Sequence, residues 1–222
     1  MAMVLSDEQK ILRDTARTFL QASAPIDQLR RLRDEASADG FDRKTWESVV
    51  EMGWTGVLVP EDHGGVGMGH VAAGVIAEEM GRTLMASPYL STAVMGATAV
   101  VGYGSASQCN KWLPPLAAGS LNVAVAVDEG RSHSPASIST TAQPTERGFR
   151  ISGSKFFVAD GHVADLILVS ARSAGAPNDT NGISLFLVPS AASGIEIQRQ
   201  TMVDSRNSAT VRLEGVEVDA ET

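Results

Sequence analysis

The stretch that decides the fold lies at residues 148–165 and reads Gly148-Phe-Arg-Ile-Ser-Gly-Ser-Lys-Phe-Phe-Val-Ala-Asp-Gly-His-Val-Ala-Asp165. It predicts a Phe-Arg-Ile strand, a turn at Ser152-Gly153, and a second strand that carries two adjacent aromatic residues, Phe156 and Phe157. Successive side chains of a strand point to opposite faces. One of these rings is therefore expected to fill a core, while the other is free to lie against a planar ring.

Before this stretch, the apolar residues recur at helical spacing. Ser6 and Gln9 form a capping-box pattern that starts a helix, and Pro25 ends it. Asp42 is placed to cap a later helix. Ala-rich apolar runs and a Pro-Pro-x-x-x-Gly ending predict further helices at residues 71–80, 90–101 and 111–118.

After Gly119 the apolar period changes from that of a helix to that of a strand. Seven strands are predicted, separated by Gly, Pro, Ser and Asn clusters, at residues 121–127, 137–142, 149–158, 166–171, 183–188, 194–200 and 210–218. This number and spacing predict a closed or nearly closed antiparallel β-barrel. The expected fold is α+β, with an all-helical domain at residues 1–119 and a β-barrel domain at residues 120–222.

Composition limits the classes of function. The 222 residues are 43% hydrophobic with a net charge of −8, so no basic surface is expected to bind nucleic acid. Cys109 is the single cysteine, so any redox chemistry needs a cofactor. His63, His70 and His162 lack metal-ligand spacing, and no metal is expected. No leader and no apolar run near the ~20 residues of a membrane span is found, which indicates a cytoplasmic protein without membrane contact.

The stretch at residues 148–165 resembles the strand pair of the acyl-CoA dehydrogenase family, in which an aromatic of a Lys-x-Trp/Phe-Ile-Thr/Ser-Asn run stacks on the flavin. Lys155, Phe157, Val158, Ala159 and Asp160 occupy those places. Three other stretches fit the same family in the same order: Val59-Pro60-Glu61-Asp62-His63-Gly64-Gly65-Val66-Gly67, Trp112-Leu113-Pro114-Pro115-Leu116-Ala117-Ala118-Gly119 and Ile183-Ser184-Leu185-Phe186-Leu187-Val188-Pro189.

The resemblance implies FAD as cofactor, an acyl-CoA thioester as substrate and oxidation of that thioester to the 2,3-enoyl product. It also implies a flavin site formed by Val125, Val127, Asp128, Ser134, Phe157, Val158 and Ala159. It implies a homo- or hetero-oligomer with another acyl-CoA dehydrogenase-like chain. The turn Gly64-Gly65-x-Gly67 is not a nucleotide-binding fingerprint, because no βαβ unit surrounds it; by resemblance it lines the acyl pocket.

Two residues depart from the family pattern. Ala159 stands where the family has a Thr or Ser that gives a hydroxyl to the flavin, and a methyl cannot donate a hydrogen bond. Asp128 aligns with a Thr of the family, and its carboxylate would oppose the negative charge of a reduced flavin. The backbone amides of Val127 and Asp128 remain able to bind the edge of the ring, because this needs no particular side chain.

No catalytic residue is predicted. In the family the base is a glutamate of a C-terminal helical domain, and this chain is expected to stop at Thr222, where that domain would begin. Two interpretations follow: the helical and barrel domains of an FAD-dependent acyl-CoA dehydrogenase, or a non-catalytic partner that completes the pockets of another subunit. An oxidase or nitroalkane-oxidising relative is a third, since the sequence does not report oxygen access.

The run Asp204-Ser205-Arg206 resembles the short Asp-x-Thr-Arg form found in actinobacterial members of the family. Glu79-Met80-Gly81-Arg82 has the same character. Such members include paired subunits that act on bulky CoA thioesters such as steroid side chains, so the resemblance implies a role in fatty acid or steroid degradation. The adjacent carboxylates Glu78 and Glu79 point about 100° apart on a helix and do not form a catalytic dyad.

Overall fold

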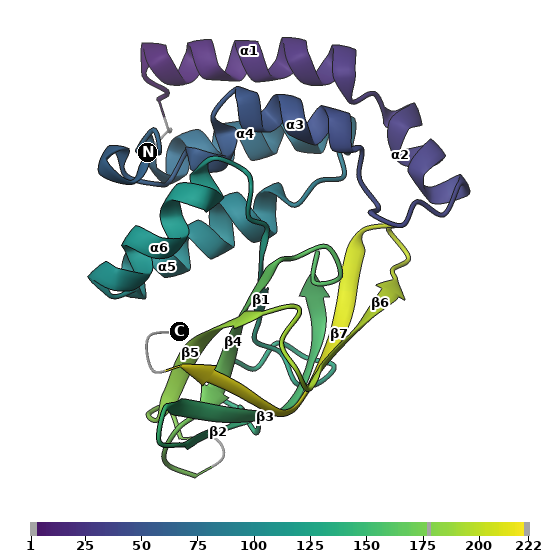
Figure 1. Cartoon of the computed structure of the whole chain (residues 1–222). Helices are drawn as coiled ribbons and strands as arrows, with labels where there is room; N and C mark the ends of the chain where they lie inside the picture. Colours follow the sequence, from purple (N-terminus) through teal and green to yellow (C-terminus); the bar gives the residue numbers. More distant parts are fainter. Residues whose placement is uncertain (1–3, 177–178, 220–222) are drawn as a thin grey trace. The chain divides into compact units, whose positions relative to one another are not determined.

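A computed structural model of the chain describes residues 4–176 and 179–219. It divides into two compact units, which we call the helical unit (Met1–Tyr103 with Cys109–Ser120) and the sheet unit (Gly104–Gln108 with Leu121–Thr222) (Figure 1). In the part of the chain that the structure describes, no helix combines the length and the apolar character needed to cross a membrane.

The helices follow local signals in the sequence. They are α1 (Asp7–Ser23), α2 (Ile26–Asp34), α3 (Arg43–Glu51), α4 (Gly69–Thr83), a π-helical segment η3 (Tyr89–Gly96) that continues into α5 (Ala97–Tyr103), and α6 (Ala106–Ala117). Single turns of 3₁₀-helix lie at η1 (Trp54–Gly56) and η2 (Glu61–His63). The predicted caps are confirmed: Ser6 and Gln9 bond reciprocally, and the Asp42 carboxylate accepts from the Thr45 amide.

The predicted bounds of the last helix were wrong. α6 begins at Ala106, because Ser105 and Gln108 form a second capping box, with bonds of 2.8 and 3.2 Å. Pro114 and Pro115 lie inside α6 instead of ending it. They occupy its final turns, and the carbonyls of both still accept from Ala118 and Ser120 beyond the helix end.

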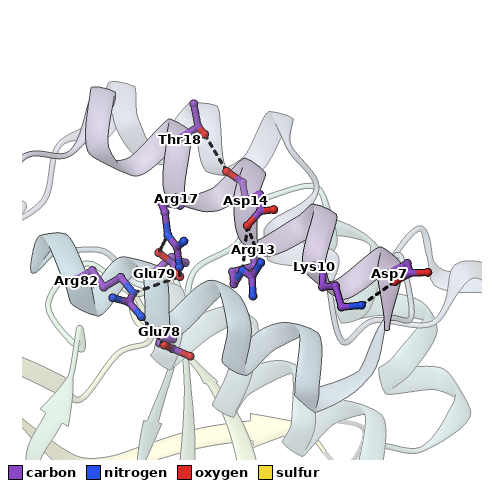
Figure 2. Close-up of polar contacts among 9 residues, drawn as sticks. All are labelled: Asp7, Lys10, Arg13, Asp14, Arg17, Thr18, Glu78, Glu79 and Arg82. Carbon is purple, nitrogen blue, oxygen red and sulfur yellow. Dashed lines mark hydrogen bonds and ion pairs between the residues drawn. The ribbon is translucent and has the colours of Figure 1, made fainter. Parts of the chain in front are cut away.

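A buried acid joins α1 to α4 (Figure 2). Arg17 donates two hydrogen bonds to the Glu79 carboxylate, from Nη2 at 2.8 Å and from Nε at 3.1 Å. Arg82 adds a 3.3 Å contact to Glu79 and bonds Glu78 at 2.9 Å. The bond from Arg17, more than any other cause, holds the pKa of Glu79 below its ordinary value. Glu79 is therefore an ionised helix-to-helix contact, and Glu78 is an exposed surface residue.

The glycine turn after η2 folds tightly against the residues that lead into it. The Gly65 amide donates to the Pro60 carbonyl at 3.0 Å, and the Gly67 amide donates to the Val59 carbonyl at 3.0 Å. A Cβ at Gly65 would overlap the backbone carbonyl of Val59. The close approach explains the glycine at this position; a role of this turn at an acyl pocket stays a prediction.

The sheet unit is built on seven strands: β1 (Val123–Ala126), β2 (Thr141–Pro144), β3 (Gly148–Ala159), β4 (Leu166–Arg172), β5 (Ile183–Pro189), β6 (Ile195–Thr201) and β7 (Asn207–Asp219). The sheet order is β1-β4-β2-β3-β7-β6, and β5 pairs with the other edge of β4. Every residue of β4 is buried. One apolar cluster, which includes Ile151, Ile167, Val169, Val211 and Leu213, forms the core of this unit.

The α+β class, with helices first and a sheet after them, is confirmed, but three details of the predicted barrel are corrected. The sheet is mixed: β1 and β4 run parallel, with Val123 opposite Leu166, and so do β2 and β4 at their ends. Among the described residues β5 and β6 each pair with one strand only, so the sheet is curled without closing. β2 begins at Thr141 and not at residue 137, because other groups bind the backbone of residues 137–140.

The predicted turn at Ser152-Gly153 is also wrong. β3 runs continuously from Gly148 to Ala159, and its pairing with β7 shifts register at Ile151/Gly153. A Cβ on Gly153 would overlap the side chain of Thr140. The glycine serves close packing of the loop before β2, and this irregularity bends the strand without ending it.

Candidate cofactor site

A β-bulge sets the positions of the two adjacent aromatics of β3. The register against β7 shifts between Lys155 and Val158, and both of these residues are buried. Phe156 and Phe157 lie between them; Phe156 is half-buried and 48% of Phe157 is exposed. The expectation that one ring fills the core was therefore wrong. The bulge inserts an extra residue, which leaves two consecutive side chains between two core positions.

Phe157 has a backbone φ of +54°. The left-handed region is uncommon for residues other than glycine, and for a bulky residue it is a genuine outlier. Such strained residues cluster at binding sites, where the surrounding structure holds them. Phe157 thus combines a strained backbone with a half-exposed ring that has no role in the core. These two features mark it as a candidate ligand contact.

The end of β1 lies beside this bulge. Ala124 and Ala126 belong to the core, whereas Val125 and Val127 alternate with them and are only partly buried. The Val127 carbonyl accepts from Lys155 Nζ at 3.1 Å. The Asp128 carbonyl accepts from the Phe156 amide at 2.8 Å. These bonds bring the predicted residues Val127 and Asp128 next to the segment that carries Phe157.

The Asp128 carboxylate is engaged within its own loop. It accepts from His133 Nδ1 at 2.9 Å and from the Ser134 amide at 3.3 Å. Ser134 itself is exposed. The carboxylate expected to oppose a reduced flavin thus has a basic partner, His133, whose pairing with Asp128 the sequence did not predict.

The last two residues of the predicted set lie at the end of β3. Val158 is buried in the apolar cluster, so its side chain packs inside the sheet unit. Ala159 is partly buried and pairs with Ser208 of β7. The methyl group of an alanine cannot donate a hydrogen bond to a ligand.

A buried ion pair below the bulge was not predicted. Lys155 is fully buried, and its ammonium donates to Glu129 Oε1 at 2.7 Å and to Ser170 Oγ at 3.0 Å. Burial lowers the pKa of Lys155 from its ordinary value, although Glu129 opposes this. Burial alone would raise the pKa of Glu129, but hydrogen bonds from Lys155, Thr140 and Ser139 together lower it. The pair is separated by 26 positions along the chain, so no local motif indicated it.

A cavity of about 560 Å³ opens between the loop after β1 and the bulged strand. Hydroxyl groups, backbone and one arginine dominate its lining, which consists of Glu129, Gly130, Arg131, Ser132, Ser134, Ser137, Ser139, Thr140, Gly153, Ser154 and Phe156. Of the seven predicted cofactor residues, only Ser134 lines it. The lining suits a polar or anionic group. Among the described residues, no group of three or more His, Cys, Asp or Glu side chains could hold a metal ion.

Comparison with known proteins identifies the family. Residues 6–120 match the acyl-CoA dehydrogenase N-terminal domain, and residues 124–216 match the acyl-CoA dehydrogenase middle domain. The chain belongs to the acyl-CoA dehydrogenase family. Its members are FAD-dependent oxidoreductases that act on CH–CH groups.

Curated relatives of the chain within this family come from bacteria and animals. The mitochondrial long-chain specific acyl-CoA dehydrogenase of Mus musculus is 29% identical over 86% of this chain, which covers 44% of that protein. The acyl-CoA dehydrogenase FadE12 of Mycobacterium tuberculosis is 33% identical over 72% of this chain and 42% of its own length. The chain thus spans less than half the length of these relatives.

Solved structures include heteromeric members of the family. A chain of the ChsE4-ChsE5 complex from Mycobacterium tuberculosis superposes with a TM-score of 0.87 at 26% identity, over 100% of this chain and 57% of that one. A chain of the Tcur3481-Tcur3483 steroid acyl-CoA dehydrogenase, in its G363A variant, gives a TM-score of 0.83 at 30% identity over 95% and 55%. The similarity to actinobacterial members inferred from the sequence is confirmed.

Proposed function

We propose that this chain provides the helical and middle-domain part of an FAD-dependent acyl-CoA dehydrogenase, which oxidises a CoA thioester to its 2,3-enoyl form. The observation that carries the proposal is Phe157, a half-exposed aromatic held by a strained bulge beside the end of β1. A planar ligand ring is the natural partner of such a side chain. We further propose that the protein works in the cytoplasm.

The residues present fit a flavin, with fewer side-chain donors than the family motif provides. Phe157 would lie against the ring system, while Val125 and Val127 would give an apolar contact from β1. The backbone of Val127 and Asp128 would bind the ring edge. Ala159 gives no hydroxyl, and the Asp128 carboxylate is bonded to His133. When bound, FAD supplies the acceptor for the hydride removed from the thioester.

The role of these residues in catalysis is to bind and exclude water. Phe157 and the two valines offer an apolar surface that would shield the reacting face from solvent. Removal of a proton next to the thioester carbonyl needs a positioned base, and we assign that role to no residue between 1 and 222. The base is proposed to lie in a further domain or in a companion subunit.

A visible absorption spectrum tests the proposal. The protein is incubated with FAD, separated from free FAD by gel filtration and scanned; a retained flavin band is expected. Phe157→Leu is expected to weaken binding about two- to tenfold, because an aromatic contact contributes about 0.5–1.5 kcal/mol. Phe157→Trp, which keeps the ring, is the matched control. Both variants keep a non-glycine residue in the left-handed bulge, so neither relieves the backbone strain as a glycine would.

A colourless, folded wild-type protein after incubation with FAD would overturn the enzyme proposal. A second variant sharpens the result: Ala159→Ser restores the hydroxyl of the family motif. It is expected to tighten FAD binding by the contribution of one hydrogen bond, up to about tenfold. Loosened binding in Ala159→Ser would contradict the proposed position of the ring.

The second candidate function is a non-catalytic partner of another acyl-CoA dehydrogenase subunit. The missing donor at Ala159 and the occupied carboxylate of Asp128 favour it, as does the similarity to chains of two-component complexes. Turnover of an acyl-CoA by the natural full-length protein alone would exclude this candidate. Turnover that requires a co-purified dehydrogenase-like chain would favour it over the first.

A further inference from the structure

The loop of residues 128–140, which we call the pocket loop, joins β1 to β2 without helix or strand of its own. It supplies most of the lining of the 560 Å³ cavity. Loops of this length without regular structure are uncommon in compact domains and are usually functional or disordered. The shape of the cavity therefore depends on whatever fixes this loop.

The first contact that fixes it is the Lys155–Glu129 pair. Lys155 projects from β3 and bonds Val127, just before the loop, and Glu129, at its start. The Glu129 carboxylate then accepts from the backbone amides at the other end of the loop, Ser139 at 2.6 Å and Thr140 at 2.9 Å. One buried ammonium and one carboxylate thus join the two ends of the pocket loop.

The second contact is Arg172, at the end of β4. Its side chain is buried and donates to two carbonyls of the pocket loop, Ile138 at 3.0 Å and Ala136 at 3.2 Å. It also donates to the carbonyls of Asn181 at 3.1 Å and Asp179 at 3.2 Å, in the connection from β4 to β5. Within residues 4–176 and 179–219, no carboxylate forms an ion pair with this guanidinium. Its hydrogen bonds go to backbone carbonyls of two loops.

Stability alone does not explain these two cations. Replacement of a buried ion pair by apolar residues of similar volume is often neutral or stabilising. What an apolar pair cannot supply is a set of directed hydrogen bonds to a loop backbone. Lys155 and Arg172 supply these bonds, and neither residue lines the cavity.

We propose that Lys155, through Glu129, and Arg172 are positioning residues that hold the pocket loop in the shape that binds the ligand. Neither touches the ligand, and the affinity of the site depends on both. The inference rests on the proposed function in one respect: FAD is the ligand chosen as the probe.

The test removes the charges while keeping the volume. The double variant Lys155→Met with Glu129→Leu replaces the pair by apolar side chains, and Arg172→Lys keeps a charge but loses the fork that reaches several carbonyls. The matched control is the exposed pair Arg150 and Glu217, 2.9 Å apart between β3 and β7, changed to Met and Leu. Amide hydrogen exchange of residues 130–139 without ligand is measured in each variant, and the Kd for FAD is compared between Arg172→Lys and the control, because Glu129 itself lines the cavity.

Both test variants are expected to keep the sheet unit folded and to speed exchange in the pocket loop about tenfold or more, since each loses at least one charged hydrogen bond. Arg172→Lys is also expected to raise the Kd for FAD, by the factor by which the closed fraction of the loop falls. The control pair is expected to change neither. Unchanged loop exchange in a folded Arg172→Lys or double variant would overturn the proposal. If the wild-type protein binds no FAD, the proposed function fails while loop exchange still decides the positioning role.

Discussion

In the Arg17–Glu79 ion pair of the helical unit the more buried residue is the acid, whereas in the Lys155–Glu129 ion pair of the sheet unit the more buried residue is the base. Glu79 is 1% exposed and its partner Arg17 is 39% exposed; Lys155 is 0% exposed and Glu129 is 12% exposed. The first pair joins two helices, and the second joins a strand to a loop that lines a cavity. The difference indicates that the helical pair serves packing and that the sheet pair serves the shape of a site.

The position of the buried charge decides which mutation of each pair is more destabilising. Removing the exposed partner leaves a charge in the interior, while removing the buried partner leaves a charge that can reach water. Loss of the more exposed partner is thus expected to cost more in each unit. Tryptophan fluorescence reports the helical unit, because all three tryptophans, Trp46, Trp54 and Trp112, lie in it. Far-UV circular dichroism reports both units, so the sheet unit is followed as the change in circular dichroism that fluorescence does not show.

The largest effect is expected for Glu129→Ala. It leaves the Lys155 ammonium buried without a counterion and frees the amides of Ser139 and Thr140. Breaking a buried pair in this way costs about 3–5 kcal/mol. Urea unfolding followed by far-UV circular dichroism measures it, with Glu146→Ala, an exposed carboxylate of the same unit, as control. A loss equal to that of the control would remove the contrast between the two units.

The next effect concerns the helical pair. Glu79→Gln keeps the shape of the side chain and leaves Arg17 free to reach water, so a loss of about 1–2 kcal/mol is expected. Arg17→Met leaves the Glu79 carboxylate buried with Arg82 alone and is expected to destabilise the unit more than Glu79→Gln does. Unfolding followed by tryptophan fluorescence checks the order. The reverse order would contradict the rule that loss of the exposed partner costs more.

The pH dependence separates the pairs further. The pKa of Glu79 is lowered, mainly by Arg17, and that of Glu129 is lowered also. Their stabilisation is therefore complete above the unfolded pKa of about 4.3 and is lost as the pH falls through the folded pKa. The pKa of Lys155 is lowered by burial. As the pH rises, the folded protein therefore loses this proton at a lower pH than the unfolded protein does. Stability of the sheet unit should consequently rise with pH between the folded pKa and the unfolded value of about 10.4.

Two variants check this assignment. Glu79→Gln is expected to flatten the acid limb seen by tryptophan fluorescence. Lys155→Met is expected to remove the alkaline rise seen by circular dichroism. An alkaline rise that persists in Lys155→Met would assign it to another group.

The smallest effect is expected for Arg82→Ala. Arg82 is 55% exposed and lies 3.3 Å from a carboxylate that Arg17 already binds with two hydrogen bonds. Exposed pairs of this kind contribute less than about 1 kcal/mol. The same fluorescence-detected unfolding measures the change. A loss as large as that of Arg17→Met would show that the two arginines share the acid equally.

The sequence predicted what depends on neighbouring residues. Two helix starts were predicted correctly, one from Ser6 with Gln9 and one from Asp42. The reason is that a cap and the amides that it binds lie within one turn of each other in the sequence. The same reasoning could have found Ser105 with Gln108, which would have corrected the start of α6. The seven strands were found from their alternation and their turn residues.

The sequence could not predict what depends on distant strands. The bulge at Phe157 exists only against β7, and the parallel pairing of β1 with β4 needs both strands in place. Lys155 belongs to the family motif and Glu129 to a polar loop, but neither position indicates the other; their meeting depends on the sheet order. The predicted flavin residues Val127, Asp128 and Phe157 gather near the bulge, and their contact with a flavin stays a prediction.

The strand pairing also bears on how the chain reaches its fold. Two pairings of the sheet unit join residues far apart in sequence, as Gly148 is from Asp219 and Val123 is from Leu166, whereas β2 with β3, β4 with β5 and β6 with β7 pair across short connections. Long-range pairing slows folding because the intervening chain must first be closed into a loop. The two long-range pairings should therefore form after the local hairpins of the same sheet. With every tryptophan in the helical unit, a refolding experiment followed by tryptophan fluorescence would not report the step in which the proposed cofactor site forms.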